Sequence, residues 1–225
     1  MTNTTQKQIK MPSPKTLEFI GAIERQPRTT WGYSNFSLVA NPGVFPFERS
    51  SRVLADYLPV EKSESTLDMG TGSGIQAIVA YNKGAMSVLG VDIDKKAVNN
   101  AVENVRRCGL EKRIKIIQSN LFDNVPRQKF DRILANLPFT NCKYSKKNAH
   151  LLFDPEYKIH DKFLRQAKDY LSKNGKIIIV GGELADETSL YTLARKYEYY
   201  VQKQTTIRLE NIDWKVYELS AGGKR

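Results

Sequence analysis

The stretch 67–75, which reads LDMGTGSGI, decides the fold of this 225-residue chain. A short strand-like segment at 65–68 leads into it, and a helical pattern at 75–81 follows, so the stretch is predicted to be a tight turn between a strand and a helix. Its alternate glycines permit positive φ angles and let a ligand approach the backbone. The start of the helix supplies free N–H groups and the positive end of its dipole. The stretch therefore predicts a site for a nucleoside-type ligand.

The spacing of these glycines excludes two common nucleotide-binding loops. A dinucleotide fingerprint requires G-x-G-x-x-G, which would place its third glycine at position 75, where the chain has isoleucine. A phosphate-binding loop requires Gly-Lys-Ser/Thr, and none follows. The observed pattern is G-x-G-x-G preceded by an acid, Asp68. An acid at this point favours a cationic ligand over a phosphate.

Strand-like and helix-like segments alternate from residue 65 onward, which predicts a mainly parallel sheet covered on both faces. The expected strands lie at 65–68, 87–91, 114–118, 130–135 and 176–180, and the expected helices at 47–58, 75–81, 95–108, 156–171 and 187–196. The last two strand-like segments, 199–209 and 214–219, are too close together for a parallel crossover and predict an antiparallel hairpin. The fold class is therefore α/β, with a Rossmann-like, seven-stranded, mainly parallel sheet and a C-terminal hairpin.

The chain is expected to divide into a disordered lead-in at 1–15, a short lid segment at 16–45 and one main domain at 46–225. Strands are expected within 31–45. The chain lacks the apolar core of a secretory signal and any apolar run of the roughly 20 residues that a membrane span needs, so a cytoplasmic location is expected. Two cysteines cannot form a disulfide framework, and neither His150 nor His160 has a metal-ligand spacing. No metal is expected.

Polar side chains follow two further predicted strands. Asp92 ends the strand at 87–91, where a carboxylate can accept hydrogen bonds from ribose hydroxyls. Asp94 is placed to cap the next helix. Asn120 and Leu121 follow the strand at 114–118. Because the carboxyl ends of parallel strands meet at one edge of a sheet, these residues are expected to lie beside the glycine loop.

With these motifs the chain resembles the class I S-adenosylmethionine-dependent methyltransferases, whose first motif is acid-x-G-x-G-x-G. The resemblance implies that Asp68 lies near the methionyl amine of S-adenosylmethionine and that Ile93 packs on its adenine. The amide of Asn120 would contact the adenine amino group, where related enzymes often have aspartate. The implied cofactor-binding residues are Asp68, Gly70, Thr71, Gly72, Gly74, Asp92, Ile93, Asn120, Leu121 and Asn136.

The segment Asn136-Leu137-Pro138-Phe139 follows the strand at 130–135. It resembles the Asn/Asp-Pro-Pro-Tyr/Phe tetrad of methyltransferases that modify planar nitrogens, and these residues are the implied catalytic group. The side-chain oxygen of Asn136 and the backbone carbonyl of Leu137 can accept the two hydrogens of an amino nitrogen and favour the positive charge that develops on it. Phe139 can stack on a planar acceptor. Leucine replaces the usual proline, but the carbonyl is retained.

The net charge of +11 favours an anionic partner without identifying it, because the excess is spread along the chain. Lys143, Tyr144, Lys146 and Lys147, which follow the tetrad, are candidates for a basic rim that contacts substrate. RNA, ribosomal or transfer, is the favoured partner, with an exocyclic amino group of a base as acceptor. The oligomeric state is left open.

Two alternatives to RNA methylation remain. One is a protein glutamine methyltransferase of the release-factor type, although those enzymes usually carry a helical substrate domain and only about 45 residues precede the first expected helix here. The other is a non-catalytic, nucleic-acid-binding relic of the fold. The segment 41–45, NPGVF, is similar to one in the small-domain ribosomal RNA guanine methyltransferases, which implies that Ser50 and Ser51 lie near the methionine end of the cofactor.

Overall fold

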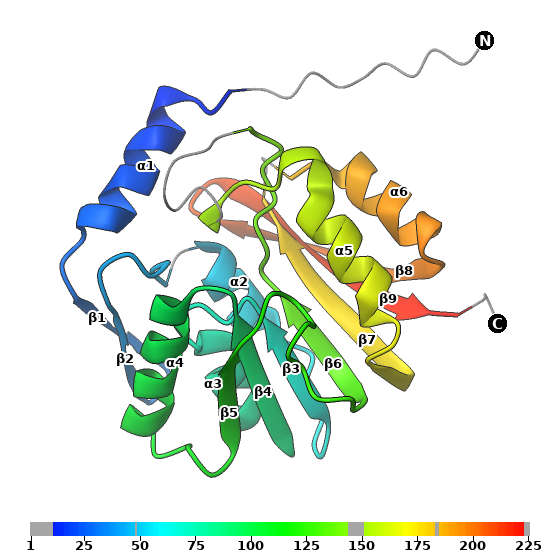
Figure 1. Ribbon diagram of the computed structural model, residues 1–225, viewed down its shortest axis with the longest axis horizontal. Helices are drawn as coiled ribbons and strands as arrows, with labels where there is room; N and C mark the ends of the chain where they lie inside the picture. Colours follow the sequence, from blue (N-terminus) through cyan, green and yellow to red (C-terminus); the bar gives the residue numbers. More distant parts are fainter. Residues whose placement is uncertain (1–10, 48, 144–150, 183–184, 223–225) are drawn as a thin grey trace.

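The computed structural model describes residues 11–47, 49–143, 151–182 and 185–222. Its main sheet has seven strands in the order β5-β4-β3-β6-β7-β9-β8, parallel except for β9, which is antiparallel to β7 and β8 (Figure 1). The predicted fold class is therefore confirmed. The strands are β3 Ser65–Met69, β4 Ser87–Asp92, β5 Ile114–Gln118, β6 Phe130–Ala135, β7 Leu171–Gly181, β8 Tyr199–Leu209 and β9 Ile212–Ala221.

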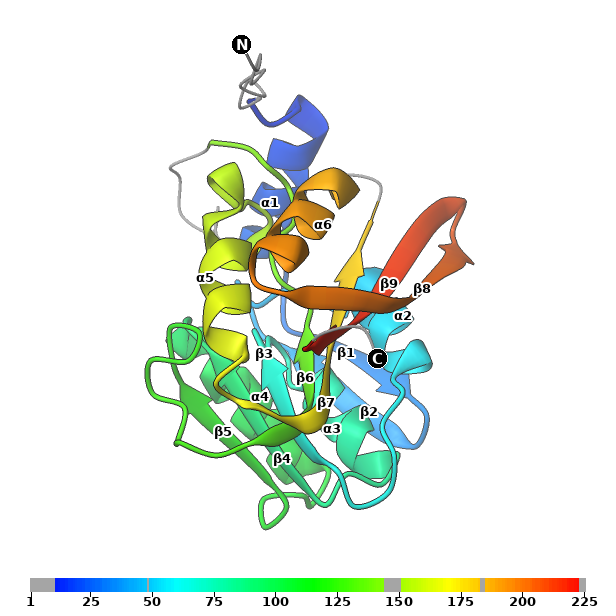
Figure 2. The ribbon, with the colours of Figure 1, turned by 90° about the vertical axis from the view of Figure 1, so that its right-hand side faces the viewer.

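Helices cover both faces of this sheet: α2 and α3 lie on one face, and α5 and α6 on the other (Figure 2). The helices are α2 Arg49–Tyr57, α3 Ile75–Asn82, α4 Lys95–Arg107, α5 Lys158–Ala167 and α6 Glu187–Lys196. Successive residues of a central strand serve opposite layers, since Ile133 packs with α5 and α6 while Leu134 packs with α2 and α3. Burial on both faces explains the uninterrupted apolar runs at 133–135 in β6 and 177–180 in β7.

The predicted helix at 156–171 is wrong at both ends. A short 3-10 helix, Pro155–Tyr157, comes first, and its positive φ angles at Glu156 and Tyr157 prevent a continuous α-helix. At the other end Leu171 already belongs to β7 and pairs with Phe130. A register shift between β6 and β7 follows this pair. Gly175 of β7 lies so close to β6 that a Cβ there would be 2.8 Å from the Phe130 carbonyl oxygen. The strand therefore starts five positions before the expected residue 176.

The N-terminal part contains a helix that the sequence pattern did not reveal. Helix α1, Pro14–Arg25, starts inside the expected lead-in, so residues 14 and 15 are helical rather than disordered. The Ser13 side chain caps it by accepting a hydrogen bond from the Thr16 backbone N–H at 3.2 Å. Residues 1–10 lie outside the described residues. Strands β1 Thr29–Tyr33 and β2 Phe36–Ala40 then form a small antiparallel hairpin, which begins two residues before the range 31–45 in which strands were expected.

Two buried asparagines of α4 attach this small hairpin to the domain. Asn104 accepts a hydrogen bond from the Val39 N–H and donates to the Val39 carbonyl, both at 2.8 Å. It also donates to the Ser73 carbonyl in the glycine loop at 2.8 Å. Asn100 donates to the Val39 carbonyl and accepts from the Asn41 N–H. The two amides thus satisfy backbone groups of β2 as a neighbouring strand would, and Asn104 joins β2 to the glycine loop.

The C-terminal hairpin turns through Glu210 and Asn211, whose φ angles are 51° and 62°. Two consecutive positive φ values are typical of a two-residue type I′ turn, which lets β9 begin at Ile212 rather than at the expected residue 214. Neither Cys108 nor Cys142 forms a disulfide bond in the described part of the chain. Within the described ranges, no helix is long and apolar enough to traverse a bilayer.

Candidate functional site

A cavity of about 730 Å³ opens at the carboxyl ends of the central strands. The strand order reverses between β3 and β6, and open α/β sheets bind ligands at such a point. Met69 of β3 pairs with Ala135 of β6, so the glycine loop and the Asn136 tetrad leave the sheet side by side. Predicted site residues that line the cavity are Asp68, Gly70, Thr71, Gly72, Asp92, Ile93, Asn120, Leu121, Asn136, Leu137, Pro138 and Phe139.

Of the other five predicted residues, two are described but do not line the cavity, and three lie outside the described part of the chain. Gly74 is the N-cap residue of α3 with a φ of 85°, and a Cβ there would lie 3.2 Å from the Ala101 Cα, so it packs closely against α4. Lys143 is exposed and does not line the cavity. The other three, Tyr144, Lys146 and Lys147, lie outside the described residues.

Backbone hydrogen bonds hold the glycine loop against β4. The N–H groups of Gly70 and Thr71 both donate to the Val91 carbonyl at 2.9 Å. The Gly72 N–H donates to Oδ2 of Asp92 at 2.9 Å. A Cβ at Gly72 would find no atom closer than 4.0 Å, so the loop leaves open space where a ligand can approach the backbone.

Asp68 is the buried acid below this loop, with 2% of its surface exposed. Its Oδ2 accepts hydrogen bonds from the Thr71 hydroxyl at 2.6 Å and from the Ala77 N–H at 3.2 Å. Burial raises the pKa of Asp68 to about 7, the two hydrogen bonds lower it in part, and the charge of Asp92 raises it further. A positive group in the cavity would stabilise the ionised carboxylate, so this acid suits a cationic ligand.

The next part of the cavity combines a carboxylate with an exposed apolar side chain. Asp92 is half-buried, and its Oδ1 accepts a hydrogen bond from the Asp94 N–H at 2.9 Å. Asp94 in turn caps α4 by accepting from the Lys96 N–H at 2.8 Å, which confirms its predicted role. Ile93 is 54% exposed although it is apolar. A flat apolar group beside Ile93 would bury it, as the resemblance implies for an adenine ring.

The tetrad forms the other end of the cavity. Asn136 is half-buried, and its Nδ2 donates to the hydroxyls of Ser50 and Ser51 on α2, both at 3.2 Å. Phe139 meets Trp214 of β9 edge-on, with ring centroids 6.3 Å apart and planes at 80°. Trp214, expected from the sequence to be a core or lid aromatic, is buried and also lines the cavity.

Several cavity residues could not be found from the sequence motifs. Helix α1 supplies Ser13, Thr16 and Phe19, and the Phe19 ring meets Phe45 edge-on at 6.3 Å. The Ser-Pro pair that starts α1 was the signal available for this helix. The remaining lining residues without a motif include Arg49, Lys158, Lys162, Gly182 and Ile212.

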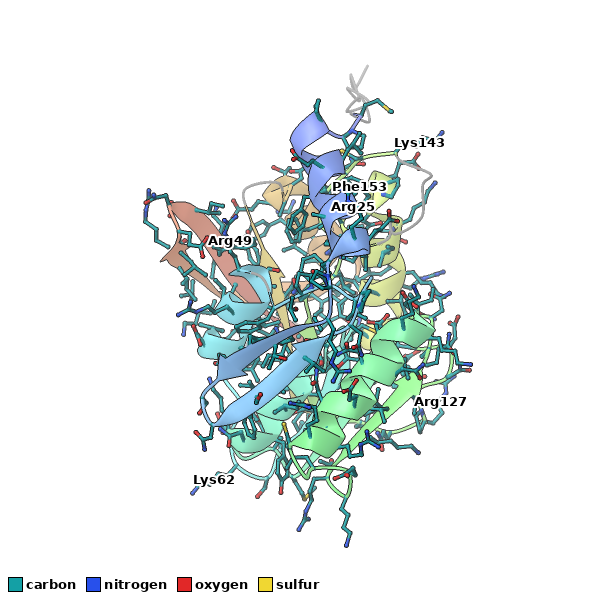
Figure 3. The ribbon with its side chains drawn as sticks, turned by 90° about the vertical axis from the view of Figure 1, so that its left-hand side faces the viewer. Arg25, Arg49, Lys62, Arg127, Lys143 and Phe153 are labelled. Atoms are coloured by element: carbon teal, nitrogen blue, oxygen red, sulfur yellow. The ribbon has the colours of Figure 1, made fainter. Side chains whose placement is uncertain are left out.

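The cations that line the cavity are held by acids. Arg49 pairs with Glu210 of the hairpin turn at 2.5 Å, and Figure 3 shows Arg49 beside that hairpin, far from Lys143. Lys162 pairs with Asp123 at 3.1 Å, and Lys158 pairs with Glu156. Each of the three described cations in the cavity lining is thus paired with a carboxylate. Among the described residues no group of acidic, histidine and cysteine side chains could hold a metal ion.

A family model described as the methyltransferase small domain matches residues 35–208. The chain belongs to this family. The family and the S-adenosylmethionine-dependent methyltransferase activity that the sequence predicted are thereby confirmed, and so is the cofactor. The cavity is consistent with that cofactor, since it presents two carboxylates and an exposed apolar side chain next to a glycine loop.

Relatives of this methyltransferase have different acceptors. A Methanocaldococcus jannaschii protein named for N5-glutamine methylation of protein is 32% identical over 67% of this chain and 78% of its own length. A tRNA1(Val) (adenine(37)-N6)-methyltransferase of Bacteroides fragilis is 30% identical over 57% of this chain and 56% of its own length. A solved methyltransferase in complex with S-adenosylhomocysteine matches 85% of this chain and 55% of its own, with a TM-score of 0.68 and 15% identity. That last likeness concerns the fold alone.

Proposed function

We propose that this methyltransferase transfers its methyl group to a planar nitrogen, the exocyclic amino group of an RNA base. The observation that carries the proposal is the side chain of Asn136. It lies in the cavity next to the glycine loop, and its hydrogen bonds among the described residues are made by Nδ2. Its Oδ1 is therefore left for an acceptor that donates N–H.

The cofactor end of the cavity has the chemistry that S-adenosylmethionine requires. When bound, the cofactor supplies an electrophilic methyl group on a sulfonium. Asp68 would hold the methionyl amine, and its carboxylate favours that charge over a phosphate. Asp92 would accept the ribose hydroxyls while its two backbone hydrogen bonds keep it at the end of β4. Ile93 and Leu121 would cover the adenine, and Asn120 would contact its amino group.

The tetrad residues would activate a weak nucleophile by position and charge. Oδ1 of Asn136 and the Leu137 carbonyl accept the two hydrogens of the acceptor nitrogen, which aims its remaining electron pair at the methyl group. These oxygens also stabilise the positive charge that develops on the nitrogen during transfer. Phe139 stacks on the planar group, and its contact with Trp214 limits its movement. No strong base is needed, because the proton leaves after the transfer.

The choice of RNA rests on the charge of the whole chain and on one relative. A net charge of +11 favours a polyanionic partner, and the Bacteroides fragilis relative is named for an adenine N6 position of tRNA. We infer that ribosomal or transfer RNA is the partner, and the cytoplasm the location. A phosphate at the cavity mouth would compete with the acids that pair with Arg49, Lys158 and Lys162.

A protein glutamine is the second candidate acceptor. The Methanocaldococcus jannaschii relative is named for glutamine methylation and aligns with two thirds of this chain. A primary amide is also a planar nitrogen with two hydrogens, so Asn136 and Leu137 would hold it in the same way. The two candidates differ in the size and charge of the partner and share the transfer chemistry.

Labelling separates these candidates. The purified chain is incubated with methyl-tritiated S-adenosylmethionine and a cell extract, and the product is digested with nuclease or with protease. Label released by nuclease and retained after protease supports RNA, and activity that falls steeply with added salt supports phosphate contacts. Label lost to protease alone overturns RNA in favour of glutamine. No label in either fraction, with no binding of S-adenosylhomocysteine in calorimetry, would indicate the non-catalytic relic.

A further inference from the structure

The amide nitrogen of Asn136 is held by two adjacent serines of the first turn of α2. Nδ2 lies 3.2 Å from the hydroxyl oxygens of both Ser50 and Ser51. The amide group has two N–H donors and meets two hydroxyl acceptors on this side. The residues are 86 and 85 positions apart in the chain, so tertiary packing alone creates this arrangement.

The serines are themselves rigidly placed. Ser50 is 4% exposed and Ser51 is 6% exposed. The Ser51 carbonyl accepts a hydrogen bond from Nε2 of Gln76 at 2.9 Å, and Gln76 is buried in α3. Helix α3 starts at the end of the glycine loop. The position of the two hydroxyls is therefore fixed by the same helix that ends the cofactor loop.

We propose that Ser50 and Ser51 are positioning residues that orient the Asn136 amide so that its oxygen faces the acceptor nitrogen. This inference rests on the proposed transfer to a planar nitrogen. An amide is asymmetric, since its oxygen accepts hydrogen bonds and its nitrogen donates them. The flipped amide would present N–H groups to an acceptor that also presents N–H groups, and transfer would lose one of its two aligning hydrogen bonds.

Removing the hydroxyls tests this role. The substrate for this test is the RNA or protein fraction that takes up label in the experiment above. With that substrate, the Ser50→Ala/Ser51→Ala double variant should lower kcat about tenfold, the scale of one lost hydrogen bond. Each single variant should lower kcat by less than half as much, on a logarithmic scale, because one hydroxyl still holds the amide. The Kd of S-adenosylhomocysteine, measured by calorimetry, should change by less than about threefold.

A matched control separates orientation from helix stability. Val53 is buried on α2, has no polar side-chain group that could hold Asn136, and packs in the core below the helix. Val53→Ala should lower the melting temperature at least as much as the serine changes while leaving kcat nearly unaltered. An equal fall of kcat in Val53→Ala and in the double serine variant would contradict the positioning role.

Replacing the asymmetric amide by a symmetric group gives a second test. In an Asn136→Asp background both side-chain oxygens accept hydrogen bonds, so no orientation has to be chosen. Adding Ser50→Ala/Ser51→Ala to this background should then cost less than about threefold, a clear departure from additivity. The same tenfold cost in both backgrounds overturns the proposal. If Asn136→Asp has no measurable turnover, the comparison with Val53→Ala decides. Full activity of Asn136→Ala would instead refute the proposed function itself.

Discussion

The two ends of the cavity are built in different ways. At the cofactor end the key contacts are local: the Gly72 N–H meets Asp92 across 20 positions, and one strand-turn-helix unit carries Asp68 and the glycine loop. At the acceptor end Asn136 meets Ser50 across 86 positions, and Phe139 meets a tryptophan of the last strand. The difference shows that the residues at the cofactor end lie in short motifs at the ends of neighbouring strands, whereas the surroundings of Asn136 are assembled from distant segments. Changes at each end should therefore affect different measurable quantities.

The largest expected effect is that of replacing Asn136, which should change turnover without changing cofactor affinity. Asn136→Ala should reduce kcat by about 100-fold, the scale of losing one oriented hydrogen-bonding group in a transition state. Because Asp68, Asp92 and the glycine loop remain, the Kd of S-adenosylhomocysteine should stay within about threefold of the wild-type value. Steady-state kinetics and calorimetry on the same preparation check the split. A parallel loss of cofactor affinity would show that the ends are not independent.

The next effect concerns the attachment of the β1-β2 hairpin to the cofactor end. Asn104→Leu keeps a similar volume but leaves the buried backbone groups of Val39 and the Ser73 carbonyl without their partner. The free energy of unfolding should fall by about 2–3 kcal/mol, as measured by urea denaturation. An exposed asparagine of the same helix supplies the control, since Asn99→Leu should change stability by no more than about 0.5 kcal/mol. Equal stability of both variants would show that the buried amides are dispensable.

A third effect lies wholly at the cofactor end and depends on pH. The pKa of Asp68 is raised to about 7 by burial, so much of this carboxyl is protonated at pH 6 in the free protein. A cofactor that requires the carboxylate should therefore bind about tenfold more tightly at pH 8 than at pH 6. Calorimetric titration with S-adenosylhomocysteine over this range checks the slope. Asp68→Asn should bind weakly with a flat profile, and a sloping profile in that variant would assign the titration to another group.

The raised pKa of Asp68 has the opposite effect on the free protein, whose stability it lowers as the pH rises. Because the folded pKa of Asp68 lies above the ordinary value of 3.8, the folded state binds the proton more tightly than the unfolded state. This group therefore contributes stability below about pH 4 that is lost as the pH rises through 7. Bound cofactor should reduce that loss, which thermal unfolding with and without S-adenosylhomocysteine would show.

The smallest expected effect is that of helix α1 on cofactor binding. Phe19 of α1 lines the cavity and meets Phe45 edge-on. Phe19→Ala should weaken cofactor binding about threefold, as expected for a partly buried apolar contact. The adjacent exposed residue is the control, and Glu18→Ala should leave the Kd unchanged. Unaltered binding in both variants would limit α1 to a structural role.

The cofactor end could be predicted well from the sequence because its determinants are local. The glycine spacing, the acid before it and the acid at the end of the next strand each follow from the residues of one strand or turn. The capping prediction for Asp94 was local in the same way, and Asp94 does cap α4 through the Lys96 N–H. The sequence did not reveal that packing also requires glycine at position 74, where a Cβ would lie 3.2 Å from Ala101 of α4.

At the acceptor end, the sequence predicted the tetrad residues but not the side chains that surround them. The tetrad at Asn136 was evident from the sequence, whereas its contact with Ser50 and Ser51 depends on how α2 packs against α3. Trp214 reaches the cavity because β9 pairs with β7, a strand that is distant in the chain. The helix expected at 156–171 starts later because Glu156 and Tyr157 adopt positive φ angles, and it ends earlier because Leu171 already pairs with Phe130 in β7.

The most direct test of the proposed transfer is the position of the methyl group in the product. RNA that has taken up label is digested to nucleosides, and the modified nucleoside is identified by mass spectrometry against N-methylated, C-methylated and ribose-methylated standards. We expect a single modified nucleoside that carries its methyl on an exocyclic amino nitrogen and disappears with Asn136→Ala. A methyl group on a ring carbon or a ribose oxygen would contradict the role assigned to Asn136 and Leu137.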